Sequence, residues 1–172
     1  MRTIPDRSEA AEFYFTYINK VADGDIRRLL ADQSGEILTL LRGISDEASL
    51  RRYAPDKWSI REVVSHISDA ERVFSFRAFW FARGFAEPMP AFDQDAGMPF
   101  AMADHRSWDS LLDEFAAIRA ATVALFDSLS DAAWDRRGIA SGHSVTVRAL
   151  AYICAGHAAH HMGVLKDRYL AA

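Results

Sequence analysis

Three histidines near the end of the chain are the residues best suited to metal chemistry. They lie in the string His157-Ala158-Ala159-His160-His161, inside a stretch whose apolar residues recur with a helical period. Successive helical residues advance by about 100°, so His161 lies about 40° from His157 and both face the apolar stripe. Two imidazoles at positions i and i+4 can bind one ion, as in helices that supply two zinc ligands. The same spacing also fits two core histidines with separate hydrogen bonds.

His160 lies about 60° from His157 in the other direction, at the edge of the stripe. The middle of the stripe lies on the His161 side, as defined by Leu150, Ile153, Cys154, Val164 and Leu165. We therefore expect His161, not His160, to join His157 at a metal ion. His160 is expected either at the pocket mouth, as a proton shuttle or substrate contact, or packed at a helix boundary.

A third candidate ligand, His66, lies in the middle of another predicted helix, about seven residues after its N-terminal cap. Its helical face is shared by Glu62, Val63, Ala70, Val73 and Arg77. A bundle core could receive an imidazole at this depth, and a packed core histidine without a metal is the alternative. His105 and His143 fall in predicted polar loops, and we expect both at the surface.

Groups that could assist a metal are harder to place. Asp69, three residues after His66, could accept the second N–H of that imidazole. Glu71 lies on a different face and could reach the ring only across a helix interface. Both carboxylates also fit solvated helix positions. Cys154 borders the metal-facing stripe, and we expect it to be a small buried residue, not a ligand or nucleophile.

Helical periodicity dominates the elements that must position these residues. We predict long helices over residues 25–43, 59–83, 107–129 and 145–169, with a shorter helical segment over residues 9–22. Ser59 followed by Glu62 matches a capping box, and Gly84 marks the end of that helix. No alternating pattern indicates a hairpin, and residues 136–144 are predicted to form a polar loop.

The connection between Gly84 and Arg106 contains Pro88, Pro90 and Pro99 and has no helical period. It is longer than neighbouring bundle helices need, so it predicts a crossover that leaves the second and third helices parallel. The predicted fold is therefore an all-α four-helix bundle, formed as a single domain by residues 1–172.

The amino-acid composition argues against nucleic acids and membranes as binding partners. Half of the 172 residues are apolar, and 20 basic against 24 acidic residues give a net charge of −4, so the chain has no electrostatic drive toward nucleic acid. No apolar run approaches the length of a membrane span. A single cysteine and the lack of a signal-peptide pattern at the start predict a cytoplasmic protein.

Two segments resemble signatures of the DinB/YfiT-like superfamily. They are residues 57–71, KWSIREVVSHISDAE, and residues 156–163, GHAAHHMG. The order of the segments, the long connection between them and the chain length also match. Many members continue the second signature with Gln after the Gly. Here Gly163 is followed by Val164, so any role of that Gln in substrate handling is not expected.

The resemblance implies an up-down-down-up bundle with a divalent metal, zinc or nickel, held by His66, His157 and His161. Members include thiol-dependent S-transferases, isomerases that use a low-molecular-weight thiol, and presumed hydrolases. We therefore expect a metalloenzyme that activates a bound water or thiol against a small molecule, with thiol transfer favoured over hydrolysis. Other catalytic residues are unknown, and Asp69 and His160 are the candidates for support. The alternatives are a metal- or ligand-binding module without turnover and a scaffold whose histidines are residual core groups.

Aromatic residues are dense on the second predicted helix, at Phe74, Phe76, Phe79, Trp80 and Phe81. They wrap more than one side of the helix, so some must contact a partner other than the bundle core. We expect a homodimer whose interface buries part of residues 76–81.

Overall fold

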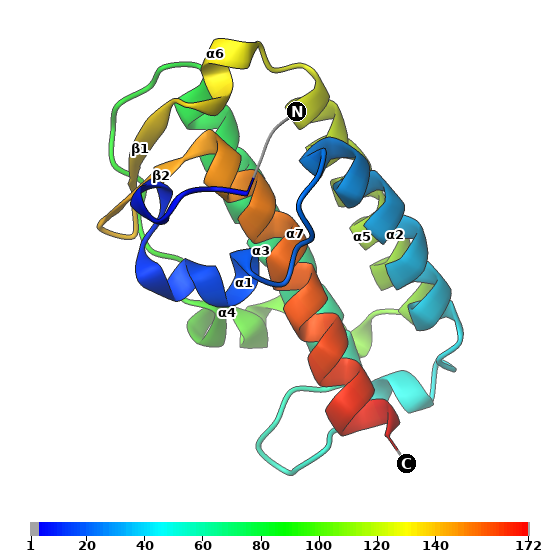
Figure 1. Ribbon diagram of the computed structural model, residues 1–172. Helices are drawn as coiled ribbons and strands as arrows, with labels where there is room; N and C mark the ends of the chain where they lie inside the picture. The colour runs from blue at the N-terminus through cyan, green and yellow to red at the C-terminus, as the bar shows by residue number, and fades with distance from the viewer. Residues whose placement is uncertain (1–3, 172) are drawn as a thin grey trace.

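Four long helices form the body of the protein (Figure 1). The computed structural model describes residues 4–171. Its long helices are α2 (Ile26–Arg42), α3 (Ile60–Ala82), α5 (Trp108–Asp127) and α7 (Val147–Val164), the last of which continues as a π-helical turn, Leu165–Leu170. Each lies within a few residues of a helix predicted from the sequence. No helix in the described part of the chain is long and apolar enough to cross a membrane.

Local sequence sets both ends of α3, the helix that carries His66. At its start, Ser59 Oγ accepts a hydrogen bond from Glu62 N at 3.0 Å, and Glu62 Oε2 accepts one from Ser59 N at 2.8 Å. This is the predicted capping box. At its end, Gly84 takes a φ of +86°, a left-handed conformation that residues with a side chain rarely adopt.

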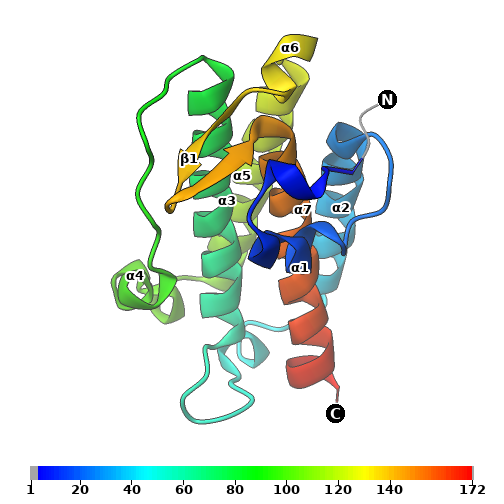
Figure 2. The same ribbon diagram turned by 60° about the vertical axis from the view of Figure 1, so that its left-hand side comes forward.

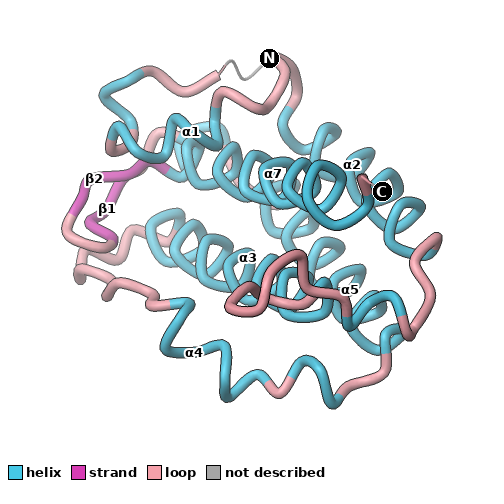
Figure 3. The backbone as a smooth tube through the Cα atoms, turned by 90° about the horizontal axis from the view of Figure 1, so that it is seen from below, coloured by secondary structure: helices cyan, strands magenta, loops and turns pink. Residues whose placement is uncertain are grey.

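The helices follow the predicted up-down-down-up order. In Figure 1, α3 and α5 run upward whereas α2 and α7 run downward. Seen from below in Figure 3, α7 and α2 form one row and α3 and α5 the other. Each helix therefore packs against two neighbours, and α3 lies between α7 and α5. Because α3 and α5 are parallel neighbours, the chain must return along the bundle between them, as the length of that connection predicts.

The returning connection contains a helix that periodicity did not predict. It descends beside α3 and forms α4 (Gln94–Ala101) outside the bundle (Figure 2). Asp93 caps this helix by accepting a hydrogen bond from Ala96 N at 3.0 Å. Only Met98 within α4 is buried. With one buried residue in eight, the segment has no apolar stripe to detect, and Pro99 further weakens the helical signal.

The prediction of a polar loop over residues 136–144 was wrong, because the segment forms a hairpin. Strands β1 (Arg137–Ala140) and β2 (His143–Thr146) pair antiparallel, with Ala140 opposite His143. Ser141 and Gly142 connect them with φ values of 52° and 79°, the positive angles of a two-residue type I′ turn. Strands of four residues are too short for a clear alternation, and only the Ser-Gly pair marks the turn in the sequence.

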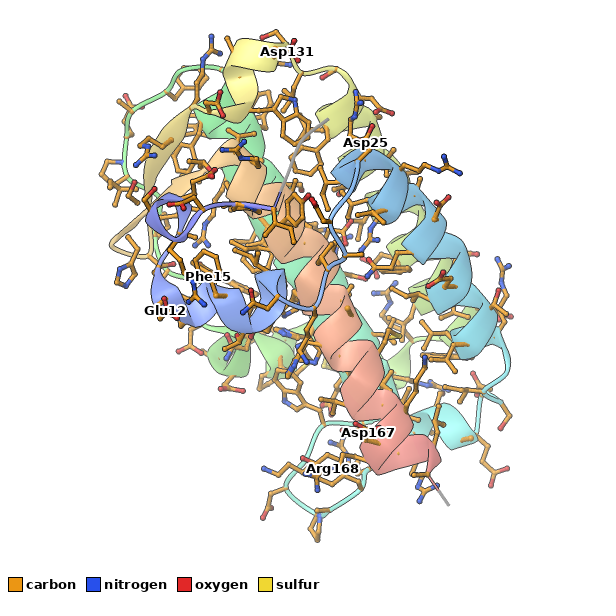
Figure 4. All side chains as sticks on the ribbon, in the orientation of Figure 1. Glu12, Phe15, Asp25, Asp131, Asp167 and Arg168 are labelled. Atoms are coloured by element: carbon orange, nitrogen blue, oxygen red, sulfur yellow. The ribbon has the colours of Figure 1, made fainter. Side chains whose placement is uncertain are left out.

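The segment over residues 9–22, predicted as one helical piece, is broken. It forms 3₁₀ turns at Arg7–Glu9 and Glu12–Tyr14, followed by the short helix α1 (Phe15–Ile18), which packs against α7. The labels of Glu12 and Phe15 mark this segment in Figure 4. Glu9 is buried and accepts hydrogen bonds from Arg148 at 2.7 and 2.9 Å. Because Arg148 lies on α7, this ion pair holds the first 3₁₀ turn against that helix. One further short helix, α6 (Asp131–Trp134), follows α5.

The close approach of α1 to α7 generates a prediction about glycine. A Cβ on Gly156 would lie 2.2 Å from the backbone oxygen of Tyr17, whereas a Cβ on Gly163 would meet nothing within 4 Å. We expect Gly156→Ala to lower the free energy of unfolding by about 1–3 kcal/mol, because backbone must move to admit the methyl group. Gly163→Ala, the matched control on the same helix, should raise it by up to about 1 kcal/mol. Urea unfolding measures both, and equal stability of the two variants would contradict the close packing of α1.

Candidate metal centre

The structure brings together the three histidines that the sequence nominated. His66 comes from α3, and His157 and His161 come from α7, one helical turn apart. The Nε2 atom of His157 lies 3.0 Å from Nε2 of His66 and 3.2 Å from Nε2 of His161. One ligand nitrogen from each ring lies within 4.8 Å of the other two. Antiparallel packing of α3 on α7 therefore turns two distant sequence motifs into one cluster.

Aromatic side chains surround this cluster. Trp58 packs against His66 with ring centroids 5.0 Å apart. Tyr17 and Phe74 contact the His157 ring edge-on at 5.3 and 5.6 Å. These rings exclude water from most of the imidazole surface and hold each ring in a defined orientation.

Burial keeps the imidazoles uncharged. His66 and His157 are only 7% and 5% exposed, and His161 is half-buried. Desolvation lowers the pKa of His66 to about 4 and that of His161 to about 3, and it holds the pKa of His157 well below its usual value. All three rings are therefore neutral near pH 7. The neutral imidazole is the form that binds a metal ion.

The nitrogen geometry fits a divalent cation better than a hydrogen-bond network. A neutral imidazole nitrogen either donates one hydrogen or accepts one, so Nε2 of His157 can satisfy only one of its two close neighbours. A tetrahedral zinc ion with bonds of about 2.0–2.1 Å holds its nitrogen ligands roughly 3.3–3.4 Å apart, close to the 3.0 and 3.2 Å between Nε2 of His157 and its two neighbours. Three neutral ligands would leave a coordination position open, as in catalytic zinc sites.

The hydrogen bond that Asp69 could accept from His66 is not formed. Asp69 instead accepts a hydrogen bond from Arg72 at 3.0 Å, because that guanidinium lies one turn further along the same helix. Nδ1 of His66 is buried without a partner among the described residues. Partial burial raises the pKa of Asp69. The carboxylate thus lies near the cluster without orienting a ligand ring.

Glu71 also has another partner. It lies on the opposite side of α3 and forms a two-pronged ion pair with Arg119 of α5, at 2.7 and 2.8 Å. Arg119 Nη1 further donates to Leu30 O and Gln33 Oε1 of α2. This fully buried pair ties α2, α3 and α5 together and leaves Glu71 with a structural role.

The remaining nominated residues lie outside the cluster. His160 is half-buried, and its ring contacts those of Tyr17 and His161 at 5.4 and 5.0 Å. His105 and His143 are exposed, as predicted. Cys154 is buried, and desolvation raises the pKa of its thiol well above the usual range, so the thiol is protonated and a poor nucleophile.

A cavity of about 410 Å³ opens onto all three histidines. Its walls also come from segments that sequence reasoning did not connect with the site: Tyr14 and Tyr17 near α1, Phe92 and Gln94 of the crossover, and Ser141 of the hairpin turn. No local signal could have found them, because each reaches the cavity only through tertiary packing. Within residues 4–171 the cavity lining includes no carboxylate and no cysteine.

An up-down-down-up bundle with three converging histidines defines a recognisable class of helical proteins. The family model of the DinB superfamily matches residues 29–165, and the chain belongs to this superfamily. No functionally curated protein matches the sequence significantly.

Two solved structures share the fold. YfiT from Bacillus subtilis, described as a probable metal-dependent hydrolase with an unusual four-helix bundle topology, is 18% identical with a TM-score of 0.67, over 95% of this chain and 89% of its own. The mycothiol-dependent maleylpyruvate isomerase is 14% identical with a TM-score of 0.61, over 83% of this chain and 59% of its own. The chain therefore spans less than two thirds of the isomerase.

The lowered pKa values predict acid sensitivity of the metal-free protein. An unfolded histidine binds a proton near pH 6.5, whereas folded His66 and His161 do so only near 4 and 3. Below about pH 6.5 the unfolded state therefore binds more protons, and each such histidine lowers the free energy of unfolding by up to about 1.4 kcal/mol per pH unit.

We expect the stability of chelated protein to fall steadily between about pH 6.5 and 5, as measured by urea unfolding. His66→Gln should make this dependence shallower, and His105→Gln, at an exposed position, should leave it unchanged. A flat profile for the wild type would show that the imidazoles are not buried as neutral groups.

Proposed function

We propose that this protein is a divalent-metal-dependent enzyme acting on a small molecule, with His66, His157 and His161 as ligands of zinc or nickel. The observation that carries the proposal is the convergence of three neutral imidazole nitrogens at the wall of one cavity. A bound divalent cation would supply Lewis acidity and lower the pKa of a water or thiol that enters its open position.

The cavity lining favours a nucleophile that comes from solution. With neither carboxylate nor cysteine among the described lining residues, the chain offers neither an obvious general base nor a thiol of its own there. A thiol has a pKa near 8.5, far below that of water, so it needs less assistance to ionise. We therefore favour transfer of a low-molecular-weight thiol to an electrophile. We retain the prediction of a cytoplasmic location, where such thiols are kept reduced.

The residues of the site have separable roles in this proposal. His157 lies between the other two ligands and contacts both. Trp58, Tyr17 and Phe74 hold the ligand rings and provide apolar walls for a substrate. We propose that His160, which is adjacent to the cluster and half-buried, exchanges protons with solvent.

Metal content separates the ligands from their neighbour. We expect about one divalent ion per chain in protein purified without chelators. His66→Ala, His157→Ala and His161→Ala should each weaken zinc binding by orders of magnitude, because two imidazoles hold the ion far less tightly than three. His160→Ala, the matched control, should retain the ion. Elemental analysis and zinc titration of chelated protein measure this, and equal loss in the His160 and His161 variants would refute the ligand assignment.

Activity assays decide among the functions that the metal allows. The loaded and the chelated proteins are tested against an epoxide and an activated ester, each with and without an added thiol. We expect turnover that needs both metal and thiol. Metal-dependent ester cleavage without thiol would make the protein a hydrolase, and a loaded protein without turnover on any of these substrates would favour a binding module.

We further propose a homodimer formed through the aromatic surface at the end of α3. Phe76 and Phe85 are 48% and 45% exposed. Phe76 stacks on Phe79, and Trp80 stacks on Phe85, with centroids 6.2 and 4.2 Å apart. Phe81, which falls within the predicted range of residues 76–81, is buried in the bundle core and is not available to a partner.

Light scattering at micromolar concentration should therefore give the mass of two chains. Phe76→Ser should shift the equilibrium toward the monomer, since it removes apolar area from the centre of this surface. Phe100→Ser, on α4 and 86% exposed, is the control and should leave the mass unchanged. A monomeric wild type would refute the dimer.

A further inference from the structure

A buried guanidinium lines the same cavity as the histidines. Arg77 of α3 is only 3% exposed. Its Nη2 donates hydrogen bonds to Pro90 O at 2.6 Å and to Ser141 Oγ at 3.1 Å. These contacts fix the end of the side chain between the crossover and the hairpin turn. The donors on Nε and Nη1 have no acceptor within residues 4–171. Neither atom is fully enclosed, so a small ligand can reach both.

Arg77 differs in this respect from the other two buried arginines of the described chain. Arg119 pairs with Glu71 at 2.7 Å, and Arg61 pairs with Asp46 at 2.8 Å. No carboxylate within residues 4–171 forms an ion pair with Arg77, although all three guanidinium groups are removed from bulk water. A buried cation without a counter-charge is strongly unfavourable unless another anion compensates it. The charge of Arg77 is thus available to a ligand in the cavity.

Arg77 lies at one end of the cavity and the histidines at the other. It follows His66 by eleven residues, which returns it to almost the same face of α3 about 16 Å further along the helix axis. Ala70 and Phe74 line the cavity between them. The small side chain of Ala70 leaves space on this face, and Phe74 offers an apolar surface. An elongated ligand can therefore contact the guanidinium with one end and the histidines with the other.

We propose that Arg77 binds the oxyanion of the small-molecule ligand, a carboxylate or a phosphate monoester. The apolar body of the ligand then lies along Ala70 and Phe74, and the opposite end reaches the three histidines. Arg77 acts by positioning the ligand through charge-assisted hydrogen bonds. The anion-binding site itself needs no metal. Only a reaction at the end of the ligand near the histidines would rest on the proposed function.

The experiment compares a planar carboxylate with its neutral amide of nearly the same shape, and adds a phosphate monoester as the second anion. Hexanoate, butyl phosphate and the neutral hexanamide are titrated calorimetrically into the full-length protein, as purified and again after chelation. We expect at least one of the two anions to bind about tenfold or more tightly than hexanamide in both preparations. Arg77→Gln should abolish this preference. Arg77→Lys, which keeps the charge, should retain part of it.

Arg28→Gln is the matched control, because it removes an exposed guanidinium from α2 and leaves the cavity lining unchanged. This variant should still prefer the anion. Wild-type protein without any preference for an anion, or Arg77→Gln with an unchanged preference, would overturn the proposal. Should Arg77→Gln not fold, the test rests on Arg77→Lys, whose fold is verified by circular dichroism. An anion preference in this variant as large as in the wild type would show that the anion binds elsewhere. The measurement on chelated protein separates the two proposals, because an anion preference without bound metal supports the Arg77 site even if the metal site proves wrong.

Discussion

The face-to-face packing of α3 on α7 is the contact on which the rest of the molecule depends, because it buries polar imidazoles from both helices at one point. His66 and His157 approach to 3.0 Å between helices that both contribute to the apolar core clusters. Such an approach requires both helices to be fixed in rotation and in register. The capping box at Ser59 fixes where α3 begins, and Gly156 lets the backbone near Tyr17 close over α7. A small rotation or shift of either helix would move Nε2 of His66 away from Nε2 of His157.

A buried ion pair on the opposite face of α3 supports the same arrangement of helices. Glu71 and Arg119 form a fully buried ion pair behind the histidines, and Arg119 extends its contacts to the carbonyl of Leu30. Since removal of either partner would leave an uncompensated charge in the core, α2, α3 and α5 are held in one relative position. One face of α3 is therefore committed to structure, which leaves the face with His66 and Arg77 to form the cavity.

Two structural neighbours differ in chemistry, one being a probable metal-dependent hydrolase and the other a mycothiol-dependent isomerase. At identities of 18% and 14%, they share the fold with this chain, and the fold alone does not select a substrate. In this chain the long helices supply the histidines and Arg77. Phe92, Gln94 and Ser141 come from the crossover and the hairpin turn, which complete the cavity. The cavity therefore has its histidines and its guanidinium on the bundle helices and part of its walls on the connecting segments.

The sequence by itself determined the four long helices, the crossover between α3 and α5, and the placement of His157 and His161 on one helical face. Each of these follows from local information: a 3.6-residue period, a cap such as Ser59 with Glu62, the length of a connection, or the spacing of His157 and His161 on one face. A resemblance to a known family added His66 as their partner.

Only the tertiary structure decided which side chains meet. Asp69 pairs with Arg72 and not with His66, and Glu9 pairs with Arg148 of α7. Arg77 has no carboxylate partner among the described residues. Periodicity reports which face of a helix is buried, but it does not report which residue of a distant segment lies opposite that face. Hydrogen bonds and ion pairs depend on separations of a few tenths of an ångström, and the packed fold alone sets those separations.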